Sequence, residues 1–228
     1  MMPQLIDKKK KLFIYFFVFF LLSTTSNKFI NNLEFSLFRV GKIDVSGLSN
    51  EDNFKVTNDL NRVLFQNIFF INKDNLIKIL SKNNLIESFY IKKVYPNLLK
   101  IDLKKTTFIA ITNNNNQNFF IGTNGKLIKY KDTGKVLPFV FGKVNYANFL
   151  EFKKIIDKSK INFKKIHSIY FFPSNRWDIK TSDGTLIKLP EKNLSQALKI
   201  AYKIMSDEQF KINNFIDLRV LNHIIILK

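Results

Sequence analysis

The segment Phe38-Arg39-Val40-Gly41-Lys42-Ile43-Asp44-Val45-Ser46-Gly47-Leu48 decides the fold of the first half of this 228-residue chain. Its apolar residues are interleaved with polar ones, which is typical of a half-buried β-strand, and we expect that strand to span residues 35–45. Gly47 ends it. Ser49 and Asp52 then have the spacing of a capping box, which predicts that a helix begins directly after the strand.

Two helices and two further strands follow this opening strand. The expected inward faces are Val56, Leu60, Val63 and Leu64 in the first helix and Leu76, Ile77 and Leu80 in the second. We expect Asp74 to cap the second helix. Strands at Ile86–Val94 and Leu98–Lys105 are joined by Tyr95-Pro96-Asn97, and both proline and asparagine favour turns. Residues 35–106 are therefore predicted to form a compact α+β module, in the order strand, helix, helix, strand, strand.

Residues 107–228 are predicted to form a larger, mixed β domain. Its expected strands are Phe108–Ile111, Phe119–Ile121, Lys126–Tyr130, Leu137–Phe141, Ile166–Phe171, Trp177–Thr181, Thr185–Leu189, Ile216–Val220 and Ile224–Leu227. Asn113-Asn114-Asn115-Asn116 is expected to be a polar loop, and Asn124-Gly125 is the strongest hairpin signal in the chain. Helices are expected near Tyr146–Asp157 and from Asn193 or Ser195 onward, both packed on the sheet. Because strands and helices do not alternate regularly, a doubly wound parallel sheet is disfavoured, and the fold class is α+β.

The first thirty residues carry a membrane signal. Lys8-Lys9-Lys10-Lys11 runs directly into the apolar segment Leu12–Leu22, and a cationic flank stays in the cytoplasm while the following chain is exported. We expect a cytoplasmic tail over residues 1–11 and a single transmembrane helix over residues 12–30. As a helix, Leu12–Leu22 spans only about 16 Å of a hydrocarbon core roughly 30 Å thick. Two alternatives therefore stay open: a cleaved signal peptide, whose apolar region is typically this short, and a buried soluble helix.

Composition limits the classes of function. The chain has no cysteine, which excludes thiolate catalysis and cysteine-based metal sites. Its net charge of +19 would suit nucleic acid, but only Arg39, Arg62, Arg176 and Arg219 are arginines, the residue that base and phosphate recognition favours. We therefore expect no nucleic-acid binding. A mild attraction to anionic lipid headgroups or acidic envelope polymers fits the charge better.

A catalytic constellation is missing from the sequence. His167 and His223 lie in or beside strand patterns, without metal-ligand spacing. Asp178 and Asp183 flank a hairpin and could imitate a catalytic pair, but carboxylates near turns usually cap backbone groups or are solvated. We therefore expect neither an enzyme nor a bound cofactor or metal ion.

The order and spacing of several blocks resemble a known family. Phe38–Leu48 resembles the opening strand of a POTRA domain. The later blocks are Asn67–Asn72, Ile86–Ser88, Ile91–Asn97, Leu99–Ile101, Asn124–Ile128, Leu137-Pro138, Arg176–Ile179, Asp183-Gly184, Ile187–Pro190 and Ile216–Arg219. Together they resemble the bacterial FtsQ/DivIB family of cell division proteins. The resemblance implies a POTRA domain at residues 35–106, an FtsQ-type β domain at residues 107–228, and a single-pass protein of the cell inner membrane at the division septum, with both domains in the periplasm.

This resemblance also implies a function and a set of partners. Members of the family are non-catalytic scaffolds of the divisome that link early and late division proteins. They bind FtsB, and through it FtsL, and help to position septal peptidoglycan synthesis; FtsW, FtsI and FtsK are further partners. FtsB adds a strand to the open edge formed by the last strand of the β domain. Carried over by position, the partner-binding residues are Arg176, Val220, Asn222, His223, Ile224, Ile225, Ile226, Leu227 and Lys228. Val220 stands where some members carry a tyrosine.

The C-terminal sequence agrees physically with an open edge that a partner covers. Ile224-Ile225-Ile226-Leu227 is an unbroken apolar run, and such a strand at a free edge would promote aggregation unless another strand paired with it. The alternative is that this strand pairs internally and both sheet edges lie elsewhere. Two other functions also stay open: a POTRA-bearing component of outer-membrane assembly or secretion, and an anchored envelope enzyme acting on peptidoglycan.

Overall fold

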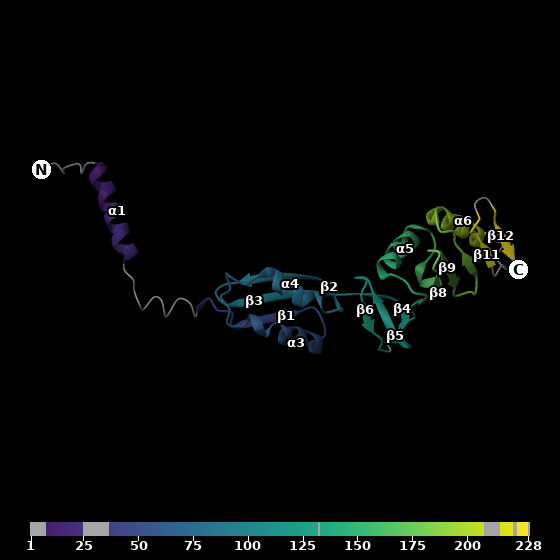
Figure 1. Ribbon diagram of the computed structural model, residues 1–228, viewed down its shortest axis with the longest axis horizontal. Coiled ribbons are helices and arrows are strands. Elements are labelled where there is room, and N and C mark those ends of the chain that lie inside the picture. Colours follow the sequence, from purple (N-terminus) through teal and green to yellow (C-terminus); the bar gives the residue numbers. More distant parts are fainter. Residues whose placement is uncertain (1–7, 25–36, 132, 208–214, 221–222, 228) are drawn as a thin grey trace.

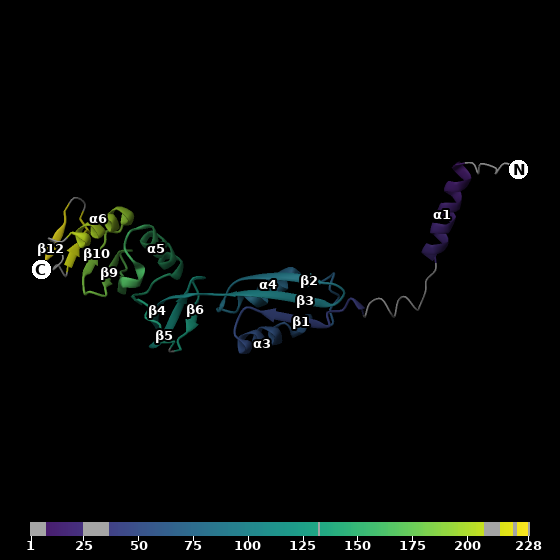
Figure 2. The ribbon, with the colours of Figure 1, turned by 180° about the vertical axis from the view of Figure 1, so that it is seen from behind.

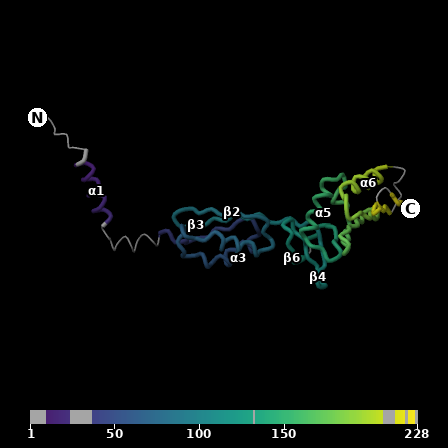
Figure 3. Tube along the Cα trace, turned by 45° about the horizontal axis from the view of Figure 1, so that its top comes forward, coloured from purple at the N-terminus to yellow at the C-terminus, as the bar shows by residue number. Residues whose placement is uncertain are grey.

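The computed structural model describes residues 8–24, 37–131, 133–207, 215–220 and 223–227. After helix α1 (Lys8–Thr24), these residues form two modules that lie end to end (Figure 1). The turned view of Figure 3 shows the same succession, with the first module in blue and the second in teal, green and yellow. The chain is thus built as separate α+β units in series.

Helix α1 differs from the transmembrane helix expected over residues 12–30. It begins at Lys8 and therefore includes lysines, and it ends after 17 residues at Thr24. Among the described helices, none combines the length and the apolar character needed to cross a membrane. Residues 25–30 of the expected anchor lie outside the described residues.

The first module has the predicted order of elements. Its elements are β1 (Lys42–Ser46), α3 (Asn50–Asp59), the 3-10 helix η1 (Asn61–Val63), α4 (Lys73–Ser81), β2 (Ile86–Val94) and β3 (Leu98–Lys105). The sheet order is β1-β3-β2, with β1 parallel and β2 antiparallel to the central β3. Val56 of α3 and Leu76 of α4 belong to the same core as Leu99 and Ile101 of β3, all of them buried. The central strand is therefore the one on which both helices rest.

Three local predictions for this module were wrong. One concerns Ile77, expected to face inward, which is 37% exposed. The opening strand begins at Lys42, because the segment before it pairs elsewhere: Arg39 forms a bridge with Asn67, and the Val40 nitrogen donates to the Gln66 carbonyl. The cap of α4 is Asn72, whose side-chain oxygen accepts from the Asp74 nitrogen at 2.8 Å. Ser49 does cap α3, because its hydroxyl accepts from the Asp52 nitrogen.

The second module is a mixed sheet of nine strands among the described residues. The strands are β4 (Phe108–Asn114), β5 (Gln117–Gly122), β6 (Leu127–Lys129), β7 (Phe139–Phe141), β8 (Ile166–Phe171), β9 (Trp177–Thr181), β10 (Leu186–Lys188), β11 (Phe215–Asp217) and β12 (Ile225–Leu227). Their order is β12-β11-β10-β9-β8-β7-β4-β5-β6. Helices α5 (Tyr146–Lys158) and α6 (Leu194–Ser206) contribute to the same core, and η2 (Phe163–Lys165) precedes β8.

A row of isoleucines crosses this sheet on the face that the two helices cover. Ile169, Ile179, Ile187, Ile216 and Ile226 are partners in register from β8 to β12. They belong to the core that also contains side chains of α5 and α6. Cross-strand partners lie on one side of a sheet, so this row fixes which face of β12 points inward.

Several boundaries in the second module differ from the prediction, and two differ by three residues. The expected four-asparagine loop is reduced to a turn at Asn115 and Asn116, both with positive φ, because β4 and β5 extend to Asn114 and Gln117. Strand β11 ends at Asp217 instead of Val220. The reason is local: the Asp217 carboxylate accepts from the Arg219 nitrogen at 3.0 Å, a turn geometry that competes with the ladder.

The two modules meet at the Asn124-Gly125 turn. The Asn124 amide donates to the backbone carbonyls of Asn84 and Ile86, both at 2.9 Å, and the Asn84 amide donates to the Leu127 carbonyl at 2.8 Å. Lys126 adds a hydrogen bond from Nζ to the Ser81 carbonyl. This hairpin therefore both reverses the chain and holds the second module against the first.

Candidate partner-binding edge

Strand β12 lies at one end of the sheet in the described part of the chain. It pairs with β11 in antiparallel register, and no described strand follows it in the order. Figures 1 and 2 show this yellow strand at the end of the second module that is distant from the first module. A terminal strand leaves one row of backbone N–H and C=O groups without a strand partner.

The two faces near this edge differ sharply in chemistry. The core face carries the isoleucine row, whereas the opposite face carries a row of charges: Asp178 on β9 is in register with Lys188 on β10, which is in register with Asp217 on β11. Asp178 is 3% exposed and Asp217 is 5% exposed. Buried carboxylates require compensation, which their neighbours provide.

Each carboxylate in this row is bound by an arginine two residues away in sequence. Arg176 Nε lies 3.3 Å from Asp178 Oδ1. Arg219 Nε lies 2.9 Å from both Asp217 oxygens, and its Nη2 lies 2.5 Å from Oδ2. The hydrogen bonds from Arg219 lower the pKa of Asp217, whereas burial raises the pKa of Asp178 despite the charge of Arg176. The two carboxylates facing Lys188 are therefore electrostatically unequal.

Arg176 lies in the turn between β8 and β9. Its guanidinium is 4.3 Å above the ring of Phe172, and its side chain is 25% exposed. Three strand spacings separate β9 from β12, which is about 14 Å at ~4.8 Å per strand. Arg176 is thus on the charged side of the sheet, but it does not lie on the edge strand itself.

A cavity of about 340 Å³ opens on the helix side of the edge. Val220, His223 and Ile224 line it from the end of the chain, and Gln196 and Ile200 line it from α6. Val220 and Ile224 are each at least half exposed. These three predicted site residues therefore lie together, beside β12 and under α6.

The structure divides the predicted site residues into groups. Val220, His223 and Ile224 line the cavity, Ile226 packs on the core, and Ile225, half exposed, is in register with Asp217 of the charged row. The strand β12 includes Leu227, and Asn222 and Lys228 lie outside the described residues.

Sequence reasoning missed the charged row beside the edge. Lys188, Asp217 and Arg219 join Asp178 and Arg176 on one face, although they come from distant parts of the chain. The alternation Asp217-Leu218-Arg219 signals that the two charged residues share a face. Their placement next to Asp178 depends on the order of the strands.

The two carboxylates considered as a catalytic pair have separate structural partners. Asp178 is bound by Arg176, and Asp183 accepts from the Thr181 hydroxyl in the β9–β10 turn, which lowers the pKa of Asp183. Within the described residues, no three His, Asp or Glu side chains are grouped so that they could hold a metal ion.

Comparison with known proteins supports both modules. Residues 110–219 match the model of the family "Cell division protein FtsQ/DivIB, C-terminal", and residues 38–105 match "POTRA domain, FtsQ-type". The chain is similar to "Cell division protein FtsQ" of Rickettsia bellii, with 30% identity over 71% of this chain and 61% of that one. It is also similar to "Cell division protein FtsQ" of Rickettsia typhi, with 28% identity over 84% of this chain and 73% of that one.

These matches cover part of the length of each relative. The match with the Rickettsia bellii protein spans about three fifths of that protein's length. Both family models follow one another along the chain in the order that the resemblance implied, and they cover the two α+β modules described above. The chain therefore belongs to the FtsQ/DivIB family, whose members are non-catalytic proteins of the bacterial division site.

Proposed function

We propose that this protein is a non-catalytic scaffold of the divisome that links early and late division proteins and binds FtsB, and through it FtsL, by strand addition to β12. The observation that carries the proposal is that β12 is the last strand of the sheet among the residues that the structure describes. Successive residues of a strand direct their backbone groups alternately to its two sides. Half of the β12 backbone groups therefore remain for an added strand.

The side chains beside this edge support selective binding. An added strand gains affinity from backbone hydrogen bonds and specificity from side chains at alternate positions. On one face the partner would meet Ile225 next to the Asp217–Arg219 pair, and on the other it would meet the cavity lined by Val220, His223 and Ile224. This combination favours a partner strand with apolar residues facing the cavity and an acidic residue facing Arg219.

The membrane location is part of the same proposal. Helix α1 carries an apolar run from Leu12 to Leu22, and we assign it, with the residues that follow, as the inner-membrane anchor. Lys8–Lys11 would then stay in the cytoplasm and both modules would lie in the periplasm at the septum. Holding single-pass partners in one plane raises their effective concentration, so that FtsW, FtsI and FtsK come within reach of the same scaffold.

The proposal is tested by changing one backbone donor on each terminal strand of the sheet. The Leu218 nitrogen donates to the Lys188 carbonyl, so Asp217 and its register partner Ile225 face each other, and the outward donor of β12 is the nitrogen of Ile226. Proline at Ile226 removes this N–H and disfavours the approach of another strand. The matched control is Lys129→Pro on β6, the terminal strand at the opposite end of the described sheet. We expect full-length Ile226→Pro to lose co-purification with FtsB and Lys129→Pro to retain it, with both variants folded by circular dichroism.

Deletion of Ile224–Lys228 gives a second measurement. We expect this truncation to lose FtsB while the first module stays folded, because that module has its own core. FtsB capture by the truncated protein, or loss of capture only in Lys129→Pro, would contradict binding at β12. Midcell localisation of a fluorescent fusion separates the scaffold from a component of outer-membrane assembly or secretion.

A further inference from the structure

One end of the first module carries a cluster of exposed apolar side chains that the proposed partner site does not use. We call it the aromatic tip; its members are Leu37, Phe65, Phe69, Phe70 and Tyr95, each more than half exposed. Phe70 is 81% exposed and Phe65 is 75% exposed. Large apolar side chains that gather at the surface usually mark a binding surface.

Three segments of the chain build this tip, and hydrogen bonds hold them together. The Ile68 nitrogen donates to the Phe38 carbonyl at 2.8 Å, and the Gly41 nitrogen donates to the Asn97 carbonyl at 2.9 Å. The ring of Phe69 lies between those of Phe38 and Tyr95, at centroid distances of 5.1 and 5.0 Å. The aromatic tip is therefore an ordered surface made by residues 37–41, 64–70 and 95–97.

The backbone at Phe65 is strained in a way that keeps its ring outside. Phe65 has a φ of +66°, which a bulky residue rarely adopts. Its nitrogen donates to the Val40 carbonyl at 2.9 Å, and the Val40 nitrogen donates to the Gln66 carbonyl at 2.9 Å, so both sides of the residue are fixed. Strain that the surroundings maintain is often associated with a functional position.

The segments that build the tip contain no acidic residue. The ranges 37–43, 60–73 and 91–99, which include these segments and their neighbours in sequence, contain no Asp or Glu, and Asp44, Asp59 and Asp74 border them. Their basic residues are Arg39, Lys42, Arg62, Lys73, Lys92 and Lys93. One of them, Lys93, also stabilises the tip, because its Nζ donates a hydrogen bond to the Phe69 carbonyl at 3.2 Å. Aromatic and basic side chains without acidic ones suit a surface that is both apolar and anionic, as at the headgroup boundary of a lipid bilayer.

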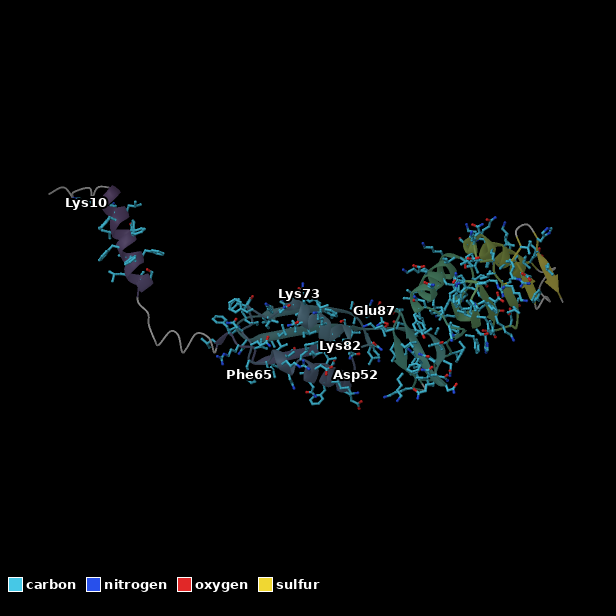
Figure 4. The ribbon with its side chains drawn as sticks, viewed as in Figure 1. Lys10, Asp52, Phe65, Lys73, Lys82 and Glu87 are labelled. Carbon is cyan, nitrogen blue, oxygen red and sulfur yellow. The ribbon has the colours of Figure 1, made fainter. Side chains whose placement is uncertain are left out.

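The tip is also the end at which the chain enters the module from α1. Leu37 is the first described residue after residues 25–36, and Figure 4 places Phe65 toward this end, with Asp52 and Glu87 toward the other. Thirteen residue steps from Thr24 to Leu37 span at most about 47 Å, at ~3.6 Å per residue. A module tethered this closely to a membrane helix presents the tip within reach of the bilayer.

From these observations we infer that the aromatic tip docks on the surface of an anionic bilayer, with the rings of Phe65 and Phe70 at the headgroup boundary and the basic residues over the lipid charges. The inference rests on the proposed membrane anchoring by α1, and it adds a second contact between protein and membrane. That contact would restrict the orientation of the first module and hence of the β12 edge beyond it.

The test uses full-length protein reconstituted in vesicles and a single label. The chain has no cysteine, so Phe70→Cys carries the only thiol for an environment-sensitive dye. Phe54→Cys is the matched control, because Phe54 is also an exposed phenylalanine, 66% exposed, but lies on α3 near Asp52. The vesicles contain phosphatidylcholine with or without about one third phosphatidylglycerol and a lipid-borne quencher.

We expect quenching of the dye at position 70 but not at position 54, and stronger quenching with phosphatidylglycerol. Replacing Arg62 by Gln should weaken the contact about fivefold, the factor that corresponds to ~1 kcal/mol per basic residue near an anionic surface. Equal quenching at both positions, or protection of position 70 only when another protein is added, would overturn the inference.

Failure of the anchor is distinguished by flotation of the same vesicles. Protein that does not float with the vesicles contradicts anchoring by α1, whatever the dye reports. Protein that floats but shows no quenching at position 70 contradicts docking by the tip and leaves the anchor and the β12 site standing. FtsB capture in detergent is measured separately, because it requires no bilayer.

Discussion

Arg219 binds Asp217 through two nitrogens: Nε lies 2.9 Å from both carboxylate oxygens, and Nη2 lies 2.5 Å from Oδ2. The pair lies at the end of β11, next to the terminal strand β12. Arg219 is exposed while Asp217 is buried. The arginine can therefore turn toward a partner only if the buried carboxylate keeps another donor, and the Arg219 nitrogen and Lys188 are available for that role.

Removing the Arg219 side chain should destabilise the second module moderately. Arg219→Ala leaves a buried carboxylate without its two strongest donors, and we expect a loss of about 1–3 kcal/mol in the free energy of unfolding. Arg219→Lys keeps the positive charge but not the bidentate contact with Asp217, and its free energy of unfolding should fall by less than that of Arg219→Ala. Urea unfolding followed by Trp177 fluorescence measures both variants. Equal stability of Arg219→Ala and the parent would contradict this, because Lys188 and the backbone nitrogen of residue 219 would then suffice for Asp217.

The two carboxylates facing Lys188 should respond to pH in opposite directions. Asp217 has a lowered pKa in the folded state, so its contribution is present above the unfolded value near 3.8 and is lost as the pH falls through the folded pKa. Asp217→Asn should therefore lose stability less steeply than the parent below about pH 4.

Asp178 has a raised pKa in the folded state, so its contribution is present below about pH 3.8 and is lost as the pH rises through the folded pKa. Relative to the parent, Asp178→Asn should therefore gain stability as the pH increases above 4. Urea midpoints between about pH 3 and 7 test this. Curves for Asp178→Asn and Asp217→Asn that shift in the same direction would contradict the assignment.

Phe152 and Trp177 should be a major source of stability in the second module. Their rings are stacked, with centroids 4.4 Å apart and planes 4° apart, and Phe152 is 1% exposed. Phe152→Ala creates a cavity under the sheet and should lower the free energy of unfolding by about 3–5 kcal/mol. Trp177 is the only tryptophan, so its emission should shift to the red. Phe54→Ala, at an exposed position of the first module, serves as the control and should change stability by less than about 0.5 kcal/mol.

Asn124 should couple the two modules. Its amide bridges the Asn84 and Ile86 carbonyls, so Asn124→Ala leaves both without this donor. We expect faster proteolysis near residues 105–107 and a wider distribution of interdomain distances in solution scattering, while each module stays folded. Asn113→Ala is the control, because Asn113 bonds only to Asn118 within the β4–β5 hairpin in the described contacts. The same proteolysis rate for Asn124→Ala and Asn113→Ala would argue against coupling at this turn.

Elements with strong local signals could be predicted closely. Strands Ile86–Val94, Leu98–Lys105, Ile166–Phe171 and Trp177–Thr181 have the predicted bounds, because alternation of apolar and polar residues depends only on neighbours in the chain. Predictions failed for two reasons. A distant segment competed with the local pattern at residues 38–41, which form hydrogen bonds with residues 65–68 and 97 instead of extending β1. A local side-chain contact ended β11 early, because the Asp217 carboxylate accepts from the Arg219 nitrogen.

In the candidate site, too, some features could be predicted from the sequence and others arise only from the fold. The apolar C-terminal run, its strand character and the resemblance of the blocks around it were readable from sequence, and they led to Ile224–Leu227 as an edge. The charged row was not readable, because Asp178, Lys188 and Asp217 become neighbours only through the pairing of β9, β10 and β11. Arg176 was expected at the contact, and it lies three strands from β12.

The sequence by itself determined the α+β succession of elements, the family and the apolar character of both ends of the chain. These follow from residue periodicity, turn chemistry and block order, which are local or additive along the chain. Only the tertiary structure decided that β12 is the terminal strand of the sheet in the described part of the chain, that Asn124 holds the modules together and that Phe65, Phe69 and Phe70 share a surface with Tyr95. Those relationships depend on which distant segments pair, and that choice minimises the free energy of the whole fold rather than of any single segment.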